Sequence, residues 1–225
     1  MKKETILIII VLLCITSISA KPLIVAHRGA SAYEKDNTLA SFDKAVALNA
    51  DFIELDISYL RGEFLVSHKK EKSNLTLSQA LLHLSNKTKI IIDLKEQNYE
   101  KKVGALVLNF FNPKEIIVTS INPSSLRRIK ELNPNIKTGL VLNKKNFKNI
   151  LLWVPFNYFP YKRIKDSKAD YLFPDINFIN QRFIKNAEKQ NLPLFVWTIN
   201  NKKLAEKLSK EKIIKGIVTN DPAIL

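Results

Sequence analysis

Cysteine is almost absent from this 225-residue sequence, and the single one, Cys14, lies in an apolar stretch near the N-terminus. If that stretch is removed, the remaining chain has no thiol, which excludes disulfide bonds and thiolate catalysis. Glycine and proline are also scarce, with 5 and 9 residues, so the composition excludes collagen-like and low-complexity chains. No glycine-rich phosphate loop follows the first predicted strand, which argues against a dinucleotide-binding fold.

Acidic side chains are outnumbered by basic ones, 21 to 36, which gives a formal net charge of +15. Such a charge attracts phosphate esters, anionic lipid surfaces or nucleic acid. The basic residues are spread along the chain, and no nucleic-acid-binding motif accompanies them. We therefore expect phosphorylated ligands, with an anionic membrane surface as a further candidate partner, and no nucleic acid.

Long hydrophobic runs are missing apart from Ile6–Ile15, which follows Lys2 and Lys3 and precedes small residues up to Ala20. This run is shorter than the roughly 20 apolar residues that span a bilayer. The pattern predicts an export signal over residues 1–20, cleaved near Ala20, and an exported protein, periplasmic or secreted. The alternative is an uncleaved membrane anchor. Residues 21–225 are then expected to form one domain.

Short apolar segments alternate with amphipathic ones along the rest of the chain. Expected extended segments are Leu23–Ala26, Phe52–Ile57, Phe64–Ser67, Ile90–Leu94, Glu115–Ile121, Thr138–Leu142, Tyr171–Phe173, Leu194–Ile199 and Gly216–Thr219. Expected helices are Thr38–Asn49 with Asn37 as N-cap, Thr76–Leu84, Tyr99–Phe111, Pro123–Leu132, Phe147–Trp153, Gln181–Asn191 and Lys202–Ser209, and an aromatic loop is expected around Tyr158–Tyr161. This alternation predicts an α/β fold with a parallel sheet, as a compact (β/α)₈ TIM barrel; a doubly wound open sheet is the alternative.

Carboxylates occur within two of the apolar strands. Glu54 and Asp56 are two residues apart, so both face the same side of their strand. Two like charges inside a barrel would repel and lose hydration, and a cation between them removes that difficulty. Asp93 adds a third carboxylate, with Lys95 two residues later. Oxygen ligands favour Mg²⁺ or Ca²⁺, although a rim salt bridge and an Asp93–Lys95 ion pair remain open as structural interpretations.

Two of the three histidines fall where strands end. His27 closes the first strand and His68 closes the extended piece after the Arg61–Gly62 turn, whereas His83 lies on a predicted helix and is interpreted as structural. Two imidazoles at one site can exchange protons near neutral pH. Arg28, directly after His27, offers a planar fork for phosphate.

These pieces together resemble the glycerophosphodiester phosphodiesterase family, which shares the phosphatidylinositol-phospholipase-like barrel. The matching segments, in chain order, are His27–Ser31 with Asn37–Phe42, Ala50–Asp56, Leu65–His68, Ile91–Lys95, Val196–Asn200 and Gly216–Pro222. The resemblance covers nearly all of the chain after residue 20.

The resemblance implies a role for each site residue. His27 and His68 would be the general acid and base, and Glu54, Asp56 and Asp93 would hold one divalent cation, Mg²⁺ or Ca²⁺. The substrate-binding residues would be Arg28 and Lys95 on the phosphate and Trp197 in the pocket wall. The implied reaction cleaves a small glycerophosphodiester to an alcohol and glycerol 3-phosphate, with either the substrate's own hydroxyl or water as nucleophile.

The chain also departs from the family pattern. The third-strand ligand is usually glutamate, where this chain has Asp93 with Glu96 nearby; Lys35-Asp36 replace a Pro-Glu pair, and Lys69 replaces an aspartate. The usual inserted subdomain before the third strand is missing. Two alternatives follow: a catalytically impaired barrel that binds anionic lipid or phosphorylated ligands, and a phospholipase- or sphingomyelinase-like enzyme whose Trp153–Tyr161 stretch touches a membrane.

Overall fold

The structure is a computed structural model, and it describes residues 21–68, 73–143 and 159–225. The predicted signal or anchor over residues 1–20 and the predicted helix Phe147–Trp153 lie outside these ranges. Among the helices in the described ranges, none is both long and apolar enough to traverse a bilayer.

The described strands form a single sheet that closes on itself. The strands are β1 (Leu23–His27), β2 (Phe52–Leu60), β3 (Glu63–Val66), β4 (Lys89–Leu94), β5 (Ile116–Ser120), β6 (Lys137–Leu142), β7 (Tyr171–Pro174), β8 (Leu194–Val196) and β9 (Ile214–Thr219). Their order is β1-β9-β8-β7-β6-β5-β4-β2-β3, and β1 also pairs with β2. All pairs are parallel except β2–β3, so eight parallel strands make a closed barrel and β3 is added to it. The predicted TIM barrel is confirmed, and the open sheet is excluded.

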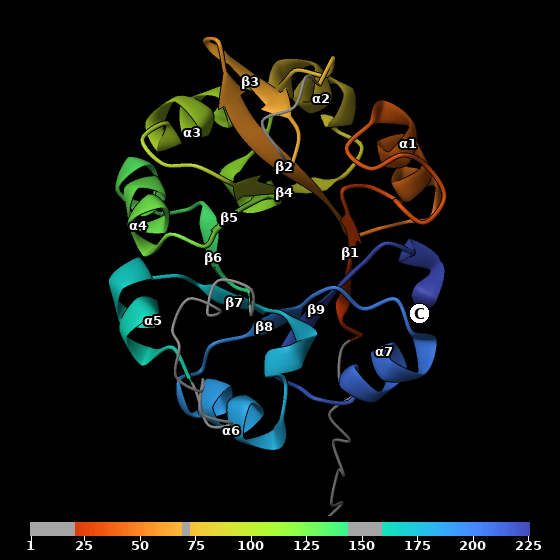
Figure 1. Cartoon of the computed structure of the whole chain (residues 1–225), viewed down its shortest axis with the longest axis vertical. Coiled ribbons are helices and arrows are strands. Elements are labelled where there is room, and N and C mark those ends of the chain that lie inside the picture. The colour runs from red at the N-terminus through yellow and green to blue at the C-terminus, as the bar shows by residue number, and fades with distance from the viewer. Residues whose placement is uncertain (1–20, 69–72, 144–158) are drawn as a thin grey trace, which may run out of the picture.

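Within the described ranges, seven α-helices surround the barrel (Figure 1). They are α1 (Leu39–Ala47), α2 (Leu77–Leu84), α3 (Glu100–Leu108), α4 (Pro123–Leu132), α5 (Tyr161–Ser167), α6 (Gln181–Lys189) and α7 (Lys202–Leu208). Short 3₁₀ turns lie at Pro113–Glu115, Ile176–Phe178 and Pro222–Ile224. Between β3 and β4 the described chain forms one helix, α2, which agrees with the predicted lack of an inserted subdomain.

Two local expectations are corrected. The N-cap of α1 is Thr38 rather than Asn37, because Thr38 and Ser41 form a capping box while the Asn37 side chain bonds to Asp56. Tyr161, expected in a loop, begins α5. Helix α5 has a single buried residue, Ser167, so its sequence carries no apolar periodicity to reveal it.

The hydrophobic core has layers inside and outside the barrel. Inside, a cluster that includes Val25, Ile91 and Val218 surrounds the stacked rings of Phe173 and Phe195, whose centroids are 4.8 Å apart. Gly216 makes room for them, since a Cβ at this position would lie 2.0 Å from the Phe195 ring. Two larger clusters fill the space between strands and helices, one under α1–α3 and one under α5–α7.

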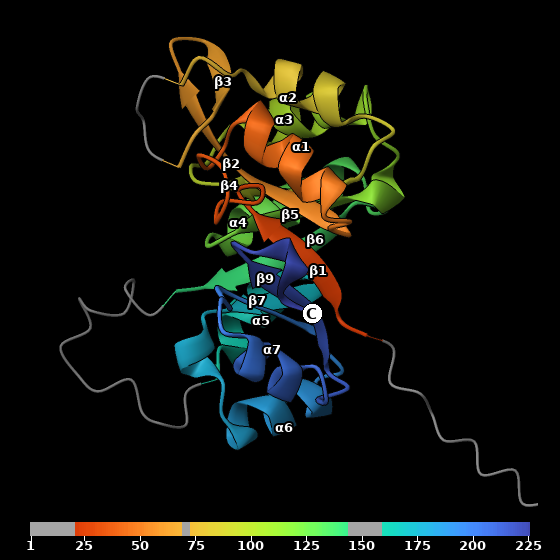
Figure 2. The same cartoon turned by 90° about the vertical axis from the view of Figure 1, so that its right-hand side faces the viewer.

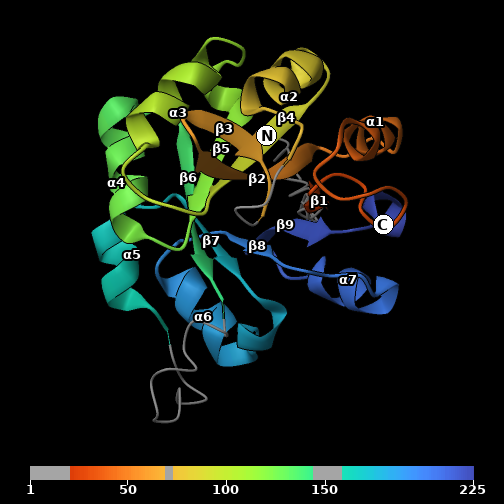
Figure 3. The same cartoon turned by 45° about the horizontal axis from the view of Figure 1, so that its top comes forward.

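The β2–β3 hairpin and the C-terminal segment both frame one end of the barrel. Strand β2 runs on past its partners in the barrel and folds back as β3, which lies beside the start of α2 (Figure 2). The C-terminal segment lies against the β1–α1 loop (Figure 3), where Tyr33 Oη donates to Asp221 Oδ1 at 2.8 Å. The carboxyl ends of the barrel strands, where polar residues were predicted to gather, open between these two features.

Candidate active site

Strand register brings the predicted polar residues together at the carboxyl end of the barrel. His27 of β1 lies opposite Glu54 of β2, and Asp56 lies opposite Asp93 of β4. Asp93 in turn lies opposite Thr119 of β5. Inward-facing residues of a strand recur every second position, so the polar pair Glu54 and Asp56 continues the inner face begun by Phe52.

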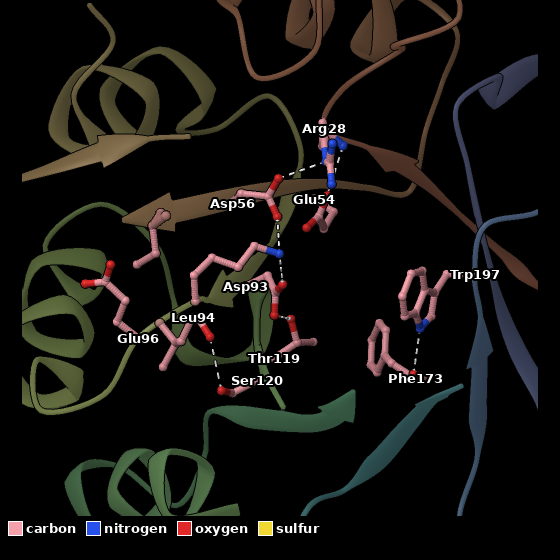
Figure 4. A network of polar contacts seen from close by, with 12 residues as sticks. Arg28, Glu54, Asp56, Asp93, Leu94, Glu96, Thr119, Ser120, Phe173 and Trp197 are labelled. Atoms are coloured by element: carbon pink, nitrogen blue, oxygen red, sulfur yellow. Dashed lines mark hydrogen bonds and ion pairs between the residues drawn. The ribbon is translucent and has the colours of Figure 1, made fainter. Parts of the chain in front are cut away.

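A cavity of about 300 Å³ opens at this end. It is lined by all eight residues predicted for the site: His27, Arg28, Glu54, Asp56, His68, Asp93, Lys95 and Trp197. Apolar side chains, including Ile121, Val141 and Phe173, complete its wall. Trp197 is fixed in the wall by its indole Nε1, which donates to the Phe173 carbonyl at 2.7 Å (Figure 4).

The three acidic residues converge on one point. One carboxylate oxygen from each of Glu54, Asp56 and Asp93 lies within 4.8 Å of the other two, and all three residues are buried. Glu96, the other candidate ligand, points away from this cluster (Figure 4). The Lys95 ammonium contacts Asp93 and lies 2.5 Å from Asp56 Oδ1, so a cation already sits among the carboxylates.

Arg28 reaches the cluster from a tight left-handed turn. Its φ of 59° and that of Gly29, 82°, turn the chain so that the Arg28 backbone N–H donates to Glu54 Oε2 at 2.9 Å. The guanidinium Nε lies 2.8 Å from Asp56 Oδ2, and Nη1 lies 3.2 Å from Asp36 Oδ2. Asp36 therefore holds the outer edge of the guanidinium.

The charges of the cluster are unequally compensated. Burial, and then the neighbouring Asp56 carboxylate, raise the pKa of Glu54 well above its ordinary value. Burial alone would also raise the pKa of Asp56, but Lys95 and Arg28 outweigh it and hold that pKa below its ordinary value. Burial opposes the charge of Lys95, yet Asp93, Asp56 and Glu54 together raise its pKa. Glu54 is thus the carboxyl whose ionised form most lacks a cationic partner.

His27 is held in one tautomer by the last strand. Its Nδ1 lies 2.8 Å from Asn220 Oδ1, which can only accept, so Nδ1 carries the proton and Nε2 keeps a free lone pair. Asn220 is itself fixed, because its backbone N–H donates to Asn200 Oδ1 at 2.9 Å. Burial, followed by the Arg28 charge, lowers the pKa of His27, which favours the neutral imidazole.

His68 is placed by the hairpin. The backbone N–H of Ser67 donates to the Asp56 carbonyl at 2.9 Å, which ties the end of β3 to β2 and brings His68 to the rim of the cavity. His68 is more exposed than His27, and loss of water contact on the cavity side lowers its pKa. His83, by contrast, pairs with Asp43 at 2.6 Å between α2 and α1, in agreement with a structural role.

Comparison with known proteins now identifies the family. The sequence matches the model of the glycerophosphoryl diester phosphodiesterase family over residues 27–71 and 67–224. YhdW of Bacillus subtilis is 31% identical over 238 residues, which span 88% of this chain and 94% of YhdW. The chain belongs to the glycerophosphoryl diester phosphodiesterase family. The predicted family and its hydrolase class are confirmed.

Further relatives agree with this family assignment. The glycerophosphodiester phosphodiesterase of Caldanaerobacter subterraneus is 25% identical over 246 residues, spanning 91% of this chain and 96% of that protein. A solved phosphodiesterase of Oleispira antarctica, in complex with the product sn-glycerol-3-phosphate, has a TM-score of 0.75 at 18% identity, covering 90% of this chain and 94% of that one. The glycerophosphodiester phosphodiesterase of Agrobacterium tumefaciens has a TM-score of 0.70 at 18% identity and covers 90% and 98%. Both solved structures share the barrel fold.

The geometry adds three polar residues to the predicted site of this family member. Asn37 Nδ2 donates to Asp56 Oδ2 at 3.0 Å, Thr119 Oγ1 donates to Asp93 Oδ1 at 2.9 Å, and Asn220 binds His27. Asn220 falls directly after the predicted strand Gly216–Thr219, within the matching segment Gly216–Pro222, but the sequence gave it no partner, and it gave no role to Thr119. Asn37 was assigned to a helix cap. In each case the partner lies on another strand, which spacing along the chain does not reveal.

Thr119 orients Asp93, the aspartate noted above as a departure from the resemblance to the family pattern. Thr119 is buried, and its hydroxyl engages one oxygen of Asp93, which turns the other oxygen toward Asp56 and Lys95. The shorter side chain thereby remains within the acidic cluster.

Proposed function

We propose that this chain is a metal-dependent phosphodiesterase that hydrolyses glycerophosphodiesters to an alcohol and glycerol 3-phosphate, with His27 and His68 as the acid–base pair. The observation that carries the proposal is the convergence of three buried carboxylates, two imidazoles, Arg28 and Lys95 around one cavity. The product glycerol 3-phosphate bound to the Oleispira antarctica enzyme of the same fold supports the substrate class.

The residues present suit a divalent cation. Their donor atoms are carboxylate oxygens, which favour Mg²⁺ or Ca²⁺ over softer ions. Asp56 Oδ1 is buried and lacks a hydrogen-bond partner among the described residues, although Lys95 lies beside it as a counter-charge. Burial, followed by the Asp56 carboxylate, raises the pKa of Glu54 in spite of Lys95 and Arg28, so its ionised form would be stabilised by a further cation. A cation bound by Glu54, Asp56 and Asp93 would neutralise these oxygens and polarise a phosphoryl oxygen of the substrate.

The other side chains of the site have separate roles in the proposed reaction. Arg28 and Lys95 bind the other phosphoryl oxygens and balance the charge that grows on them during transfer. Neutral His27, with Nδ1–H on Asn220, accepts the proton of the attacking hydroxyl at Nε2. His68 at the rim returns a proton to the leaving alcohol oxygen. Trp197 and Phe173 shield the reacting phosphate from bulk water.

The direct test is release of the alcohol and glycerol 3-phosphate from glycerophosphodiesters, assayed with Mg²⁺, with Ca²⁺ and with a chelator. We expect turnover that depends on a divalent cation. Undiminished turnover in excess chelator, after dialysis of the protein, would contradict the role of the carboxylates.

Replacement of the imidazoles tests the acid–base pair. His27→Ala and His68→Ala are each expected to reduce kcat by about 10²- to 10⁴-fold, because each removes one proton-transfer group. His83→Ala is the matched control, since His83 pairs with Asp43 away from the cavity, and it should keep the wild-type rate. Circular dichroism would verify that all three variants fold, and a wild-type rate in either of the first two would refute the assignment.

One observation favours a second candidate, a barrel that binds phosphorylated ligands without turnover. Lys95 already neutralises Asp56 and Asp93, so a cation must compete with an ammonium group for these oxygens. This candidate predicts calorimetric binding of a glycerophosphodiester by folded protein but no product with any divalent cation.

We also propose that residues 1–20 direct export and are cleaved near Ala20, on the basis of the basic and apolar pattern described above. Mass spectrometry of the protein purified from its own cells tests this. An N-terminus near Lys21 is expected, and an intact Met1 in a membrane fraction would indicate the anchor instead.

A further inference from the structure

A second cavity, of about 660 Å³, opens directly beside the catalytic one. It is lined by residues of the β1–α1 loop, by residues 66–68 at the end of β3 and by residues 73–75 before α2. Arg28 and His68 line both cavities, so they form the shared wall. In the function proposed above these two residues bind the phosphate and protonate the leaving oxygen. A diester held there has one ester arm in the catalytic cavity and places the other arm in the second one.

The two cavities differ in polarity. The catalytic cavity is closed by Ile121, Val141, Phe173 and Trp197 around its polar cluster. The second cavity is lined mainly by polar residues, among them Lys35, Thr38, Ser67, Ser73 and Asn74. Hydroxyl and amide groups at this density suit an occupant with several hydroxyl groups and not an acyl chain.

The charge of the second cavity further restricts the class of molecule that it can bind. Among the residues that the structure describes, the ionisable ones in this lining are Arg28, Lys35, Asp36 and His68. The carboxylate of Asp36 is bound to the guanidinium of Arg28 at 3.2 Å, so it is compensated. With His68 protonated for its proposed role as proton donor, the described lining carries two net positive charges, from Lys35 and His68. An alcohol that bears an ammonium group is repelled at such a site, whereas a neutral or anionic polyol is not.

We propose that this second cavity is the subsite for the leaving alcohol and that it selects a neutral or anionic polyol over choline or ethanolamine. The inference rests on the proposed phosphodiesterase activity and adds to it the class of the alcohol. Lys35 acts as the specificity-determining residue, and Arg28 and His68 mark the position of the scissile bond.

The charge argument is tested by two substrates on the full chain, glycerophosphoglycerol and glycerophosphocholine. Wild type is expected to show the higher kcat/KM for glycerophosphoglycerol. Lys35→Glu should lower the ratio of the two kcat/KM values by about tenfold, because the sign of one nearby charge is reversed. Lys114→Glu changes the net charge by the same amount, and Lys114 is an exposed residue before β5 at the opposite end of the barrel, so this control should keep the wild-type ratio.

The position of the subsite is tested by filling it. Asn74 is exposed and lines the second cavity, so Asn74→Trp should raise KM for glycerophosphoglycerol about fivefold or more, since the bulk opposes the glycerol arm. The methyl ester of glycerol 3-phosphate has a leaving alcohol too small to reach Asn74, and its KM should be unchanged.

The outcomes separate the inference from the proposed function. Hydrolysis of both diesters with a wild-type preference for glycerophosphocholine, or with equal responses to Lys35→Glu and Lys114→Glu, would overturn the subsite and leave the phosphodiesterase in place. An equal KM increase for glycerophosphoglycerol and the methyl ester in Asn74→Trp would also overturn it. Absence of hydrolysis of any diester by folded wild type would overturn the proposed function itself.

Discussion

At the scale of single residues, the site is defined by the partners that hold each reacting group. His27 is the clearest case, because its tautomer is set by Asn220 and the position of Asn220 is set by Asn200. A base that presents the wrong nitrogen is ineffective even when it lies in the right place. Asn220 is therefore a positioning residue for the imidazole.

Asn220→Ala is expected to lower kcat/KM by about 10- to 100-fold, in the range seen when supporting hydrogen bonds of a site are removed. Asn220→Asp keeps an oxygen acceptor and should retain the Nδ1–H form of His27. Nitrogen-15 NMR of the imidazole should show that form in wild type and Asn220→Asp, and a mixture of tautomers in Asn220→Ala. Asn109→Ala, at the exposed C-cap of α3, is the control. A single unchanged tautomer in Asn220→Ala would refute the role.

At the scale of elements, the β1–α1 turn joins the site to the first helix. Gly29 has a φ of 82°, and a Cβ at this position would lie 2.4 Å from Ser41 Oγ and 2.7 Å from the Ser41 backbone carbon. Ser41 belongs to the capping box of α1, so the turn and the helix N-terminus pack without spare room. Backbone conformation and packing both require glycine here.

Gly29→Ala is expected to lower the free energy of unfolding by about 3 kcal/mol, from a left-handed conformation and an overpacked contact together. Gly62→Ala separates these effects, because Gly62 has a φ of 91° but a Cβ there meets no atom within 4 Å. Gly62→Ala should lower the free energy of unfolding by about 1 kcal/mol, because only the left-handed backbone conformation opposes the alanine there. Urea denaturation of both variants measures the difference, and equal losses would contradict the packing argument.

On the opposite side of the barrel, the Asp170 carboxylate links helix α4 to strand β6. Its carboxylate lies 2.5 Å from Lys130 of α4 and 3.0 Å from Lys137 of β6, and it accepts the Thr138 backbone N–H at 2.8 Å. Burial would raise the pKa of Asp170, but these donors outweigh it and lower that pKa. A lowered folded-state pKa stabilises the fold above the unfolded-state pKa, and the gain is lost as pH falls through the folded-state value.

Asp170→Asn should therefore cost about 2 kcal/mol in the free energy of unfolding at pH 7, the scale of a charge-assisted hydrogen-bond network. The difference from wild type should shrink as the pH falls below the unfolded-state value of about 3.9. Asp166→Asn, at an exposed position of α5, is the control and should change the free energy of unfolding at pH 7 by less than about 0.5 kcal/mol. Urea titrations at several pH values measure this difference. A difference in the free energy of unfolding between Asp170→Asn and wild type that persists at acid pH would contradict the hydrogen-bond network of Asp170.

At the scale of the whole molecule, cation binding and folding are linked. Glu54 and Asp56 belong to β2 and Asp93 to β4, so their oxygens come within 4.8 Å when these two strands pair in the folded sheet. A ligand that binds the folded state alone raises its stability in proportion to the logarithm of ligand concentration.

Mg²⁺ or Ca²⁺ at about 100 times its dissociation constant should stabilise the protein by about 2.7 kcal/mol, and a chelator should reverse the gain. Differential scanning calorimetry measures the shift in Tm. Glu54→Gln with Asp56→Asn is the control that should abolish it. A cation-dependent shift that survives in this double variant would place the ion elsewhere.

The sequence predicted site residues whose relation depends on their spacing along one strand. It did not predict contacts between residues that are far apart in the chain. The two-residue interval of Glu54 and Asp56 was sufficient to predict a shared face, and the barrel placed Asp93 beside them. The partners in Asn37–Asp56, Thr119–Asp93 and Asn220–His27 belong to segments far apart in the sequence, and only the folded barrel brings them together. Helix α5 was missed because an exposed, charged helix carries no apolar period.

The pairing of β1 with β9 has a consequence for synthesis of the protein. His27 and its acceptor Asn220 are 193 residues apart, and β9, which is synthesised after β1–β8, is the strand that closes the barrel against β1. A nascent polypeptide that lacks residues 214–225 has neither the closing strand nor the group that orients the base. The contact that orients the His27 imidazole can therefore form only after β9 has been synthesised and has paired with β1.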